Sequence, residues 1–164
     1  FDVTTGNSRF NECRWIWDRL NNVNGNCLEF TCVRDSSEDF WVNHLENNFD
    51  IRSYDAILSL PEYDSHFEHR KVNNISKALL RGVDVGLITY RTPSTLEQWI
   101  PNYYTELQDE VMETKIDILR EGFNSQKDKL YFQRQRIKDF HINYQCSKVG
   151  VSYVEQFKIE RLFG

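Results

Sequence analysis

Short clusters of β-favouring residues alternate with segments of helical periodicity along the chain. The clusters are Leu28–Val33, Ala56–Leu60, Val83–Tyr90, Lys115–Leu119 and Phe140–Cys146. Their first residues lie 25 to 32 positions apart, a spacing typical of βαβ units in a parallel sheet. The tail Val151–Phe163 alternates between apolar and polar residues and predicts a last strand.

Four intervening segments have helical patterns. They are Ser37–Phe49, Ser65–Arg81, Ser94–Thr114 and Ser125–Lys138. A serine at the start of the first, Ser36 or Ser37, suits an N-cap, and Gly82 is placed to end the second. Pro101 predicts a kink or a restart within the third, because proline removes a hydrogen bond from a helix interior.

The alternation favours an α/β fold with a single domain over residues 1–164. We expect an open, mainly parallel sheet of about five strands with helices on both faces, since Ala56–Leu60 and Val85–Tyr90 are largely apolar. The alternative is a β/α solenoid of the leucine-rich type, whose repeat length overlaps this spacing. A solenoid needs leucine and asparagine at the same positions of every turn, and the chain lacks that repetition.

Composition narrows the class of protein. The chain has 164 residues, of which 40% are hydrophobic and 27% charged, enough to bury a core of its own. No apolar run approaches the ~18 residues that a membrane helix needs, so no membrane partner is predicted. Four cysteines without dense spacing predict buried free thiols and an intracellular, reducing compartment. The chain begins at Phe1 without a targeting signal, and we expect a piece whose targeting region is missing.

Two loops after predicted strands are candidates for binding an anion or a nucleotide. In open α/β sheets, ligands bind beyond the carboxyl ends of the strands, where free N–H groups gather at a helix start. The candidate ligand-binding residues in these loops are Arg34, Ser36, Ser37, Arg91, Thr92, Ser94 and Thr95. The alternative interpretation is that the hydroxyl groups only cap helices.

No cofactor and no metal site is predicted. His66 and His69 lie three apart beside Asp64 and Glu68, which would place two metal ligands on one helical face. A zinc site needs further ligands, and none follows at a recognisable spacing. We therefore interpret both histidines as polar residues of a solvated helix. No glycine-rich phosphate loop follows a predicted strand.

A basic run with interleaved aromatic residues is the candidate nucleic-acid contact. Its basic residues are Lys127, Lys129, Arg134, Arg136 and Lys138. Such a run can follow a phosphate backbone while Tyr131 and Phe132 stack on bases. The alternative is a solvated helix face anchored by its aromatic side chains. The net charge of −5 gives no general attraction to nucleic acid, so this function would depend on the local run.

The segment Ile75–Thr89 resembles the helix-to-strand segment of the phospholipase D superfamily. In that family a later strand carries a histidine that attacks phosphorus and, two residues on, a lysine that steadies the developing charge. The matching positions are His141 and Asn143, so the lysine is replaced. The resemblance therefore implies a degenerate member that binds rather than cleaves, with His141 as the candidate catalytic residue.

Two functions are compatible with these patterns. We expect a non-enzymatic α/β module that binds a protein partner and has an anion- or nucleotide-accepting cleft at the carboxyl ends of its strands. The chain has no complete set of nucleophile, base and orienting group, and 4 Trp, 8 Tyr and 11 Phe supply candidate interface anchors. The alternative is a phosphodiesterase or nuclease that uses His141 on nucleic acid or a cyclic dinucleotide.

Overall fold

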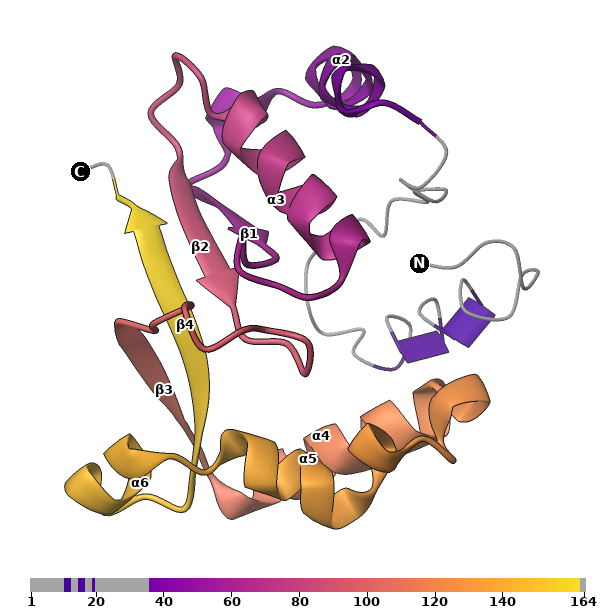
Figure 1. Ribbon diagram of the computed structural model, residues 1–164, viewed down its shortest axis with the longest axis vertical. Helices are drawn as coiled ribbons and strands as arrows, with labels where there is room; N and C mark the ends of the chain where they lie inside the picture. The colour runs from indigo at the N-terminus through magenta and orange to yellow at the C-terminus, as the bar shows by residue number, and fades with distance from the viewer. Residues whose placement is uncertain (1–10, 13–14, 17–18, 20–35, 163–164) are drawn as a thin grey trace. The chain divides into compact units, whose positions relative to one another are not determined.

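The computed structural model of the chain describes residues 11–12, 15–16, 19 and 36–162. It is an α/β structure with an open, mixed sheet of four strands in the order β1-β2-β4-β3 (Figure 1). Residues 1–32 and 106–154 form one compact unit, the helical unit, and residues 33–105 and 155–164 form another, the sheet unit. The predicted strand Leu28–Val33 lies outside the described residues, and the single domain stays a prediction.

The sheet of the protein combines one parallel pair with an antiparallel strand. Its strands are β1 (Ala56–Ser59), β2 (Gly86–Tyr90), β3 (Tyr103–Leu107) and β4 (Tyr153–Arg161). β1 pairs with β2 in parallel, whereas β2 pairs with β4 antiparallel. The expectation of a mainly parallel sheet is therefore wrong, although the strands predicted at Ala56–Leu60, Val83–Tyr90 and Val151–Phe163 are confirmed. No solenoid repeat is present among the described elements.

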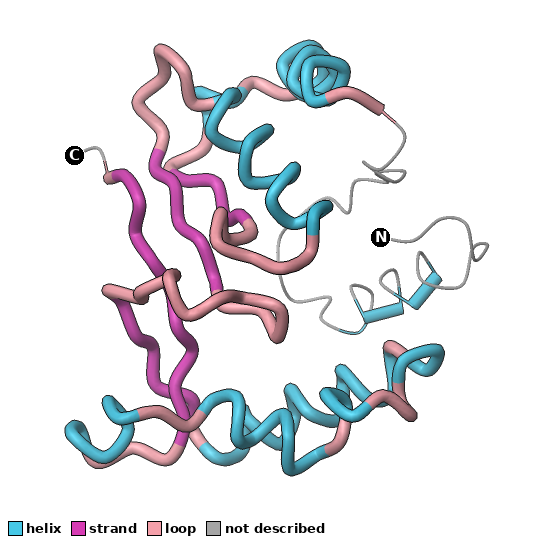
Figure 2. Tube along the Cα trace, in the orientation of Figure 1, coloured by secondary structure: helices cyan, strands magenta, loops and turns pink. Residues whose placement is uncertain are grey.

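Two helices cover one face of the β1–β2 pair. α2 (Glu38–Asn48) and α3 (Phe67–Leu79) share a buried cluster that includes Trp41 and Ile75, and Ile57 of β1 packs against it. Both helices lie on the same side of these strands in Figure 2. Because side chains alternate along a strand, Leu58 points to the opposite face, where it is 60% exposed. In the part of this unit that the structure describes, helices cover one face of β1, not both.

The ends of these helices match the sequence. The Ser37 hydroxyl accepts a hydrogen bond from the Phe40 amide at 3.1 Å, so Ser37 is the N-cap of α2. Gly82 follows α3 with φ of 74°, a left-handed conformation that favours glycine. Between α2 and β1 the chain forms the short 3₁₀ turn η2 (Ile51–Ser53).

Helices occupy positions that the sequence assigned to strands. α4 (Asp109–Gly122) contains Lys115–Leu119, and α5 (Arg134–His141) with α6 (Tyr144–Val149) replaces Phe140–Cys146. Met112 and Ile116, four residues apart on α4, are fully buried against Ile137 of α5, so the helical period prevails over a short β-favouring run. The second run does not form a strand. The Asn143 side chain accepts hydrogen bonds from the amides of Gln145 and Cys146, so Asn143 is the N-cap of α6.

Two predicted helices are shorter than expected. The pattern over Ser94–Thr114 predicts one helical segment, but the chain there forms a loop, then β3, and only from Asp109 a helix. The Asn102 side chain explains the strand, since it donates to the Ile159 carbonyl and accepts from the Ile159 amide, which holds this segment beside β4. Ser125–Lys138 forms the 3₁₀ turns η3 (Asn124–Gln126) and η4 (Leu130–Phe132) before α5 begins.

Two further sequence expectations concern cysteines and membranes. Cys146 is a buried free thiol, and the other three cysteines lie outside the described residues. None of the helices in the described ranges has the length and apolar character needed to cross a lipid bilayer.

We predict that Ile75→Ala lowers the free energy of unfolding by about 2–5 kcal/mol, because the side chain is buried between α2, α3 and β1 and leaves a cavity. Urea unfolding followed by circular dichroism measures the loss. Lys77→Ala, on the exposed side of the same helix, removes only a surface ion pair with Glu62 and is expected to cost less than about 1 kcal/mol. Equal losses for the two variants would contradict the packing described here.

Candidate functional site

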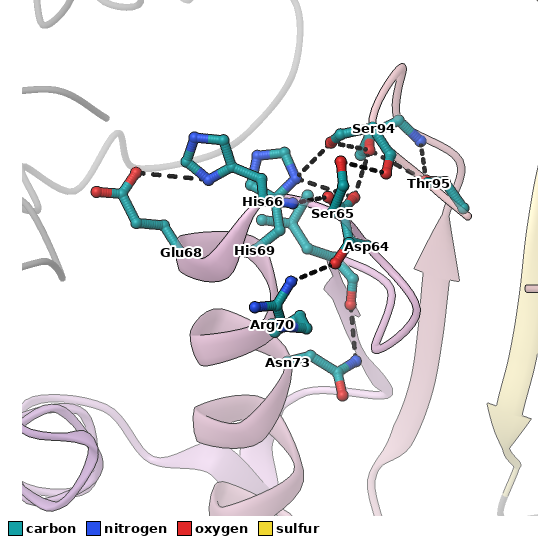
Figure 3. A network of polar contacts seen from close by, with 11 residues as sticks. Asp64, Ser65, His66, Glu68, His69, Arg70, Asn73, Ser94 and Thr95 are labelled. Carbon is teal, nitrogen blue, oxygen red and sulfur yellow. Dashed lines mark hydrogen bonds and ion pairs between the residues drawn. The ribbon is translucent and has the colours of Figure 1, made fainter.

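The loops that follow β1 and β2 meet at one edge of the sheet. Because these strands are parallel, their carboxyl ends lie at the same edge. The Ser65 amide donates to the Ser94 carbonyl and the Leu96 amide to the Tyr63 carbonyl, each at 2.9 Å. The two loops are thus joined around Asp64, which Figure 3 shows at the start of α3. Here the parallel topology does bring two strand-end loops together.

Asp64 is a fully buried carboxylate with hydrogen-bond donors on several sides. Its relative exposure is 0%. Oδ1 accepts from the His66 amide at 2.8 Å. Oδ2 accepts from the Thr92 hydroxyl at 2.7 Å and lies 3.0 Å from Nδ1 of His69. A buried charge is tolerated only when it is well hydrogen-bonded, and these donors meet that requirement.

The same donors keep Asp64 ionised. Burial alone would raise the pKa of this carboxyl, but the hydrogen bonds from Ser94, Thr92, the His66 amide and His69 together lower the pKa below its usual value. The carboxylate is therefore an acceptor only at neutral pH. Nδ1 of His69 must then carry the hydrogen between the two groups.

This arrangement fixes which nitrogen of His69 is available for chemistry. Nδ1 faces Asp64 Oδ2 at 3.0 Å and the Ser94 hydroxyl at 3.2 Å. Nε2 lies on the other side of the ring, away from both groups. Metal-binding histidines almost always donate their other ring nitrogen to a carboxylate, a carbonyl or water, which orients the ring and makes the binding nitrogen more basic, and the Asp64–His69 contact is compatible with that arrangement.

His66 stands next to His69 and is the more exposed of the two. The two rings stack with centroids 4.7 Å apart. His66 Nδ1 lies 3.7 Å from Oε2 of Glu68, whose side chain is largely buried. The site thus contains two imidazoles, each beside its own carboxylate.

α3 holds the β1 loop through its own side chains. Arg70 donates to the Asp64 carbonyl and Asn73 donates to the Leu60 carbonyl at 2.7 Å. Since residues three and four apart share a helical face, His69, Arg70 and Asn73 reach the same loop from successive turns. The buried Ser59 and Ser76 hydroxyls, 2.8 Å apart, continue this contact between β1 and α3.

The candidate residues after β2 lie in this site, but not for the reason expected. The Thr92 hydroxyl contacts Asp64 and the Ser94 hydroxyl contacts His69. Figure 3 shows Ser94 and Thr95 beside these two residues. No helix starts at Ser94, so the interpretation of Ser94 and Thr95 as helix caps is wrong. The Thr92 and Thr95 main chains instead form a turn, with Thr95 N–H donating to the Thr92 carbonyl at 3.1 Å. Arg91 is half-buried, and burial lowers the pKa of its guanidinium.

The candidate residues before α2 have other roles in the described part of the chain. The Ser36 carbonyl accepts from Lys71, and Ser37 caps α2. Arg34 lies outside the described residues. A ligand-binding cleft that includes both loops stays a prediction.

The candidates for nucleic-acid chemistry belong to the helical unit. His141 is 3% exposed at the end of α5, not on a strand as the phospholipase D resemblance required. Arg134 pairs with Glu113 and Asp117, and Lys138 pairs with Glu113. The pairing with Lys138 is the main reason why the pKa of Glu113 is lowered. Arg134 and Lys138, like Lys127, Lys129 and Arg136, stay predictions as nucleic-acid contacts.

The place of the two histidines in the site was not predicted from the sequence. His66 and His69 were treated as a solvated helix face, whereas His69 is hydrogen-bonded to a buried carboxylate. The signal was present in the order of residues, because Asp64, His66 and His69 directly follow an apolar strand with a parallel neighbour. Ligands bind at that edge of such sheets.

The site fits part of a metal centre. His69 Nε2, with Asp64 behind the ring, has the chemistry of one zinc ligand and its orienting carboxylate. Catalytic zinc sites take three protein ligands, and the described residues contain no group of three or more His, Cys, Asp or Glu that could hold a metal ion. A complete centre would need ligands from beyond the described residues.

Comparisons with known proteins give a fold likeness. The chain is similar to the conserved protein TT1542 from Thermus thermophilus, with a TM-score of 0.65 at 15% identity over 97% of this chain and 75% of that one. It is also similar to the zinc-inhibited form of teicoplanin deacetylase Orf2, with a TM-score of 0.52 at 14% identity over 82% of this chain. This chain spans 57% of the deacetylase. No protein-family model and no curated protein matches it.

We predict that Asp64→Asn lowers the free energy of unfolding at pH 7 by about 1–3 kcal/mol, because an amide group brings donors to a position already surrounded by donors. The pKa of Asp64 is lower in the folded protein, so its stabilisation is complete above the ordinary aspartate value of about 3.9 and is lost as pH falls through the folded pKa. The difference between the two proteins should therefore shrink below about pH 4.

Urea unfolding of both proteins between pH 7 and pH 2.5 measures this difference. Asp117→Asn, at an exposed aspartate paired with Arg134, is the matched control and is expected to change stability little. A constant difference between wild type and Asp64→Asn across the pH range would show that the pKa of Asp64 is not lowered in the folded protein.

Proposed function

We propose that this protein is a metal-dependent hydrolase of N-acyl groups, of the deacetylase kind, in which His69 is a zinc ligand. The observation that carries the proposal is the Asp64–His69 pair at the carboxyl edge of the parallel β1–β2 pair. The fold likeness to a teicoplanin deacetylase is consistent with the deacetylase part of the proposal.

The charge of the site favours a cation over the anion expected from sequence. The loop hydroxyls of Thr92 and Ser94 turn inward to a buried carboxylate, and the lowered pKa of Asp64 keeps that carboxylate negative. A second anion placed here would meet a like charge in a poorly solvated position. A metal ion held by His69 would instead be attracted by the same charge.

His66 is suited to proton transfer in this proposal. Imidazole exchanges protons near neutral pH, and Glu68, with Oε2 3.7 Å from His66 Nδ1, is placed to orient the ring. When an amide bond breaks, the departing nitrogen must receive a proton. His66 is exposed enough to reach a substrate and lies beside His69, so we assign it the role of general acid.

Zinc in such a centre polarises a carbonyl and lowers the pKa of a bound water to about 7. The chain's own contribution is the position of the two histidines. Asp64 orients His69, and the joined loops keep Asp64 buried.

We predict that His69→Ala weakens zinc binding by more than the ~10–100-fold that loss of an outer partner costs, because it removes a ligand itself. His66→Ala is expected to leave zinc affinity nearly unchanged and to reduce the rate of N-acyl hydrolysis by about 10²–10⁴-fold. Competition with a chromophoric chelator measures zinc affinity, and release of acetate from N-acetylated amines measures the rate.

His44→Ala is the matched control, since His44 is an exposed histidine on α2. It should change neither quantity. Equal zinc affinities for wild type, His69→Ala and His44→Ala would refute the proposed ligand.

That result would favour the non-enzymatic module instead. The exposed side chains of Leu58, Ile100 and Tyr103 are the feature that favours a protein-binding role. Trp99, in contrast, is buried and donates to the Thr89 hydroxyl, so it supplies no interface anchor.

A further inference from the structure

A second contact surface lies in the helical unit, at the carboxyl end of α4, and involves neither Asp64 nor His69. The described residues near the start of the chain, 11–12, 15–16 and 19, are helical. They repeat every three or four positions and so share one helical face, here called the N-terminal face. Residues 1–32 belong to the same compact unit as residues 106–154, although residues 33–105 separate them in the sequence.

Glu12 is the polar anchor of the N-terminal face. Its Oε1 accepts a hydrogen bond from the Ser125 amide at 2.6 Å, and its Oε2 accepts one from the Ser125 hydroxyl at 2.8 Å. Ser125 lies in η3, directly after α4. Hydrogen bonds to an ionised group are stronger than those between neutral groups, and a pair of them also fixes orientation. Glu12 therefore sets the position of the N-terminal face on the helical unit.

Gly122 makes room for the apolar part of this face. It is a buried residue of α4, and a β-carbon at its position would overlap the Ile16 side chain and lie 3.3 Å from Cε3 of Trp15. The three atoms nearest to that β-carbon all belong to Ile16 and Trp15. Because glycine weakens a helix, its presence at this position is explained by the close approach of these two side chains.

Arg19 completes the contact, seven residues after Glu12. Its Nη2 lies 3.7 Å from Oε2 of Glu121, and its guanidinium lies 5.3 Å from the centre of the Trp15 ring. Both side chains of the ion pair are more than half exposed, so the pair contributes orientation more than affinity. The surface on α4 and η3 therefore fits a helix with an acid, an aliphatic side chain four residues later and a base after three more.

The N-terminal face reaches α4 only through a long path in the sequence. Residues 20–35 join it to the described part of the sheet unit, and the chain returns to the helical unit at residue 106. Residues 21–26 are four asparagines, a valine and a glycine, a composition typical of loops. An element that packs against a distant part of its chain makes the same contacts with that part of another copy, which is the basis of domain swapping.

We propose that the surface formed by Glu121, Gly122 and Ser125, here called the docking surface, binds the N-terminal face of a second copy of this chain when its own N-terminal face is released. The chain's own N-terminal face is then an intramolecular competitor. A short connection between two binding elements gives an effective concentration of about 1 mM. At lower protein concentrations the unaltered chain therefore closes on itself and stays monomeric.

Two complementary variants test the exchange between copies. Ile16→Asp places a charge against Gly122 and disables the N-terminal face, whereas Gly122→Leu fills the docking surface and leaves the face intact. Each variant alone should be monomeric, because it lacks one half of the contact. A mixture of the two at about 0.1 mM each, below the effective concentration within one chain, should form a heterodimer in sedimentation equilibrium. A mixture that stays monomeric would overturn the proposal.

A fluorescent peptide with the sequence of residues 9–21 gives a second measurement, by anisotropy. It should bind the Ile16→Asp chain, and it should bind the unaltered chain at least about 10-fold more weakly, because that docking surface is already occupied. Glu12→Ala in the peptide should weaken binding about 10-fold, since it removes a charged acceptor. Asn11→Ala, at an exposed position, is the matched control and should bind like the unaltered peptide.

Equal affinities of the peptide for the two chains, or of the Glu12→Ala and unaltered peptides for the Ile16→Asp chain, would also overturn the proposal. Circular dichroism shows whether the variants fold. If Gly122→Leu does not fold, the peptide measurement decides. If Ile16→Asp does not fold, Glu12→Lys takes its place as the released chain. Failure of both released chains to fold would overturn the proposal, because an element that folding requires is not released.

Discussion

A buried carboxylate in the loop between β1 and α3 determines how this part of the molecule is organised. Asp64 has no exposed surface, and its charge requires donors from α3 and from the β2 loop at the same time. Breaking one contact leaves a buried charge with fewer partners, which is more costly than losing an ordinary surface hydrogen bond. The two loops, the first turn of α3 and the orientation of His69 are therefore coupled through one side chain.

The sequence predicted the elements around this carboxylate well, since β1, α3 and β2 all appear close to their expected positions. The apolar runs of these segments are long compared with the polar residues that interrupt them, and Gly82 clearly marks the end of the helical segment. The prediction failed in residues 94–146, where short apolar runs fit both the period of a helix and the period of a strand. Burial of Met112 and Ile116 against α5 made one run helical, and the contact of Asn102 with β4 made another segment a strand. Both contacts join distant parts of the chain, so no local window contains them.

The candidate site was predicted in part for a related reason. The rule that ligands bind beyond the carboxyl ends of parallel strands selected the loop of Thr92, Ser94 and Thr95, but it did not select the loop after β1, which this loop meets in the structure. It did not reveal the sign of the charge they surround, because that depends on Asp64 turning inward. The donors on the facing loop that lower the pKa of Asp64 become visible only when the loops are brought together. The role of His69 was missed because its hydrogen-bond partner, Asp64, lies five residues earlier, in the loop before the helix.

The contacts of α3 with the preceding loop also limit how this region can change. Arg70 and Asn73 bind the carbonyls of Asp64 and Leu60 from separate turns, so the number of residues between β1 and the helix is matched to the helical rise. An inserted or deleted residue between Leu60 and Asp64 would move one contact relative to the other and withdraw the carboxylate from its donors. This connection is therefore among the least able to vary in length, although loops elsewhere usually tolerate such changes.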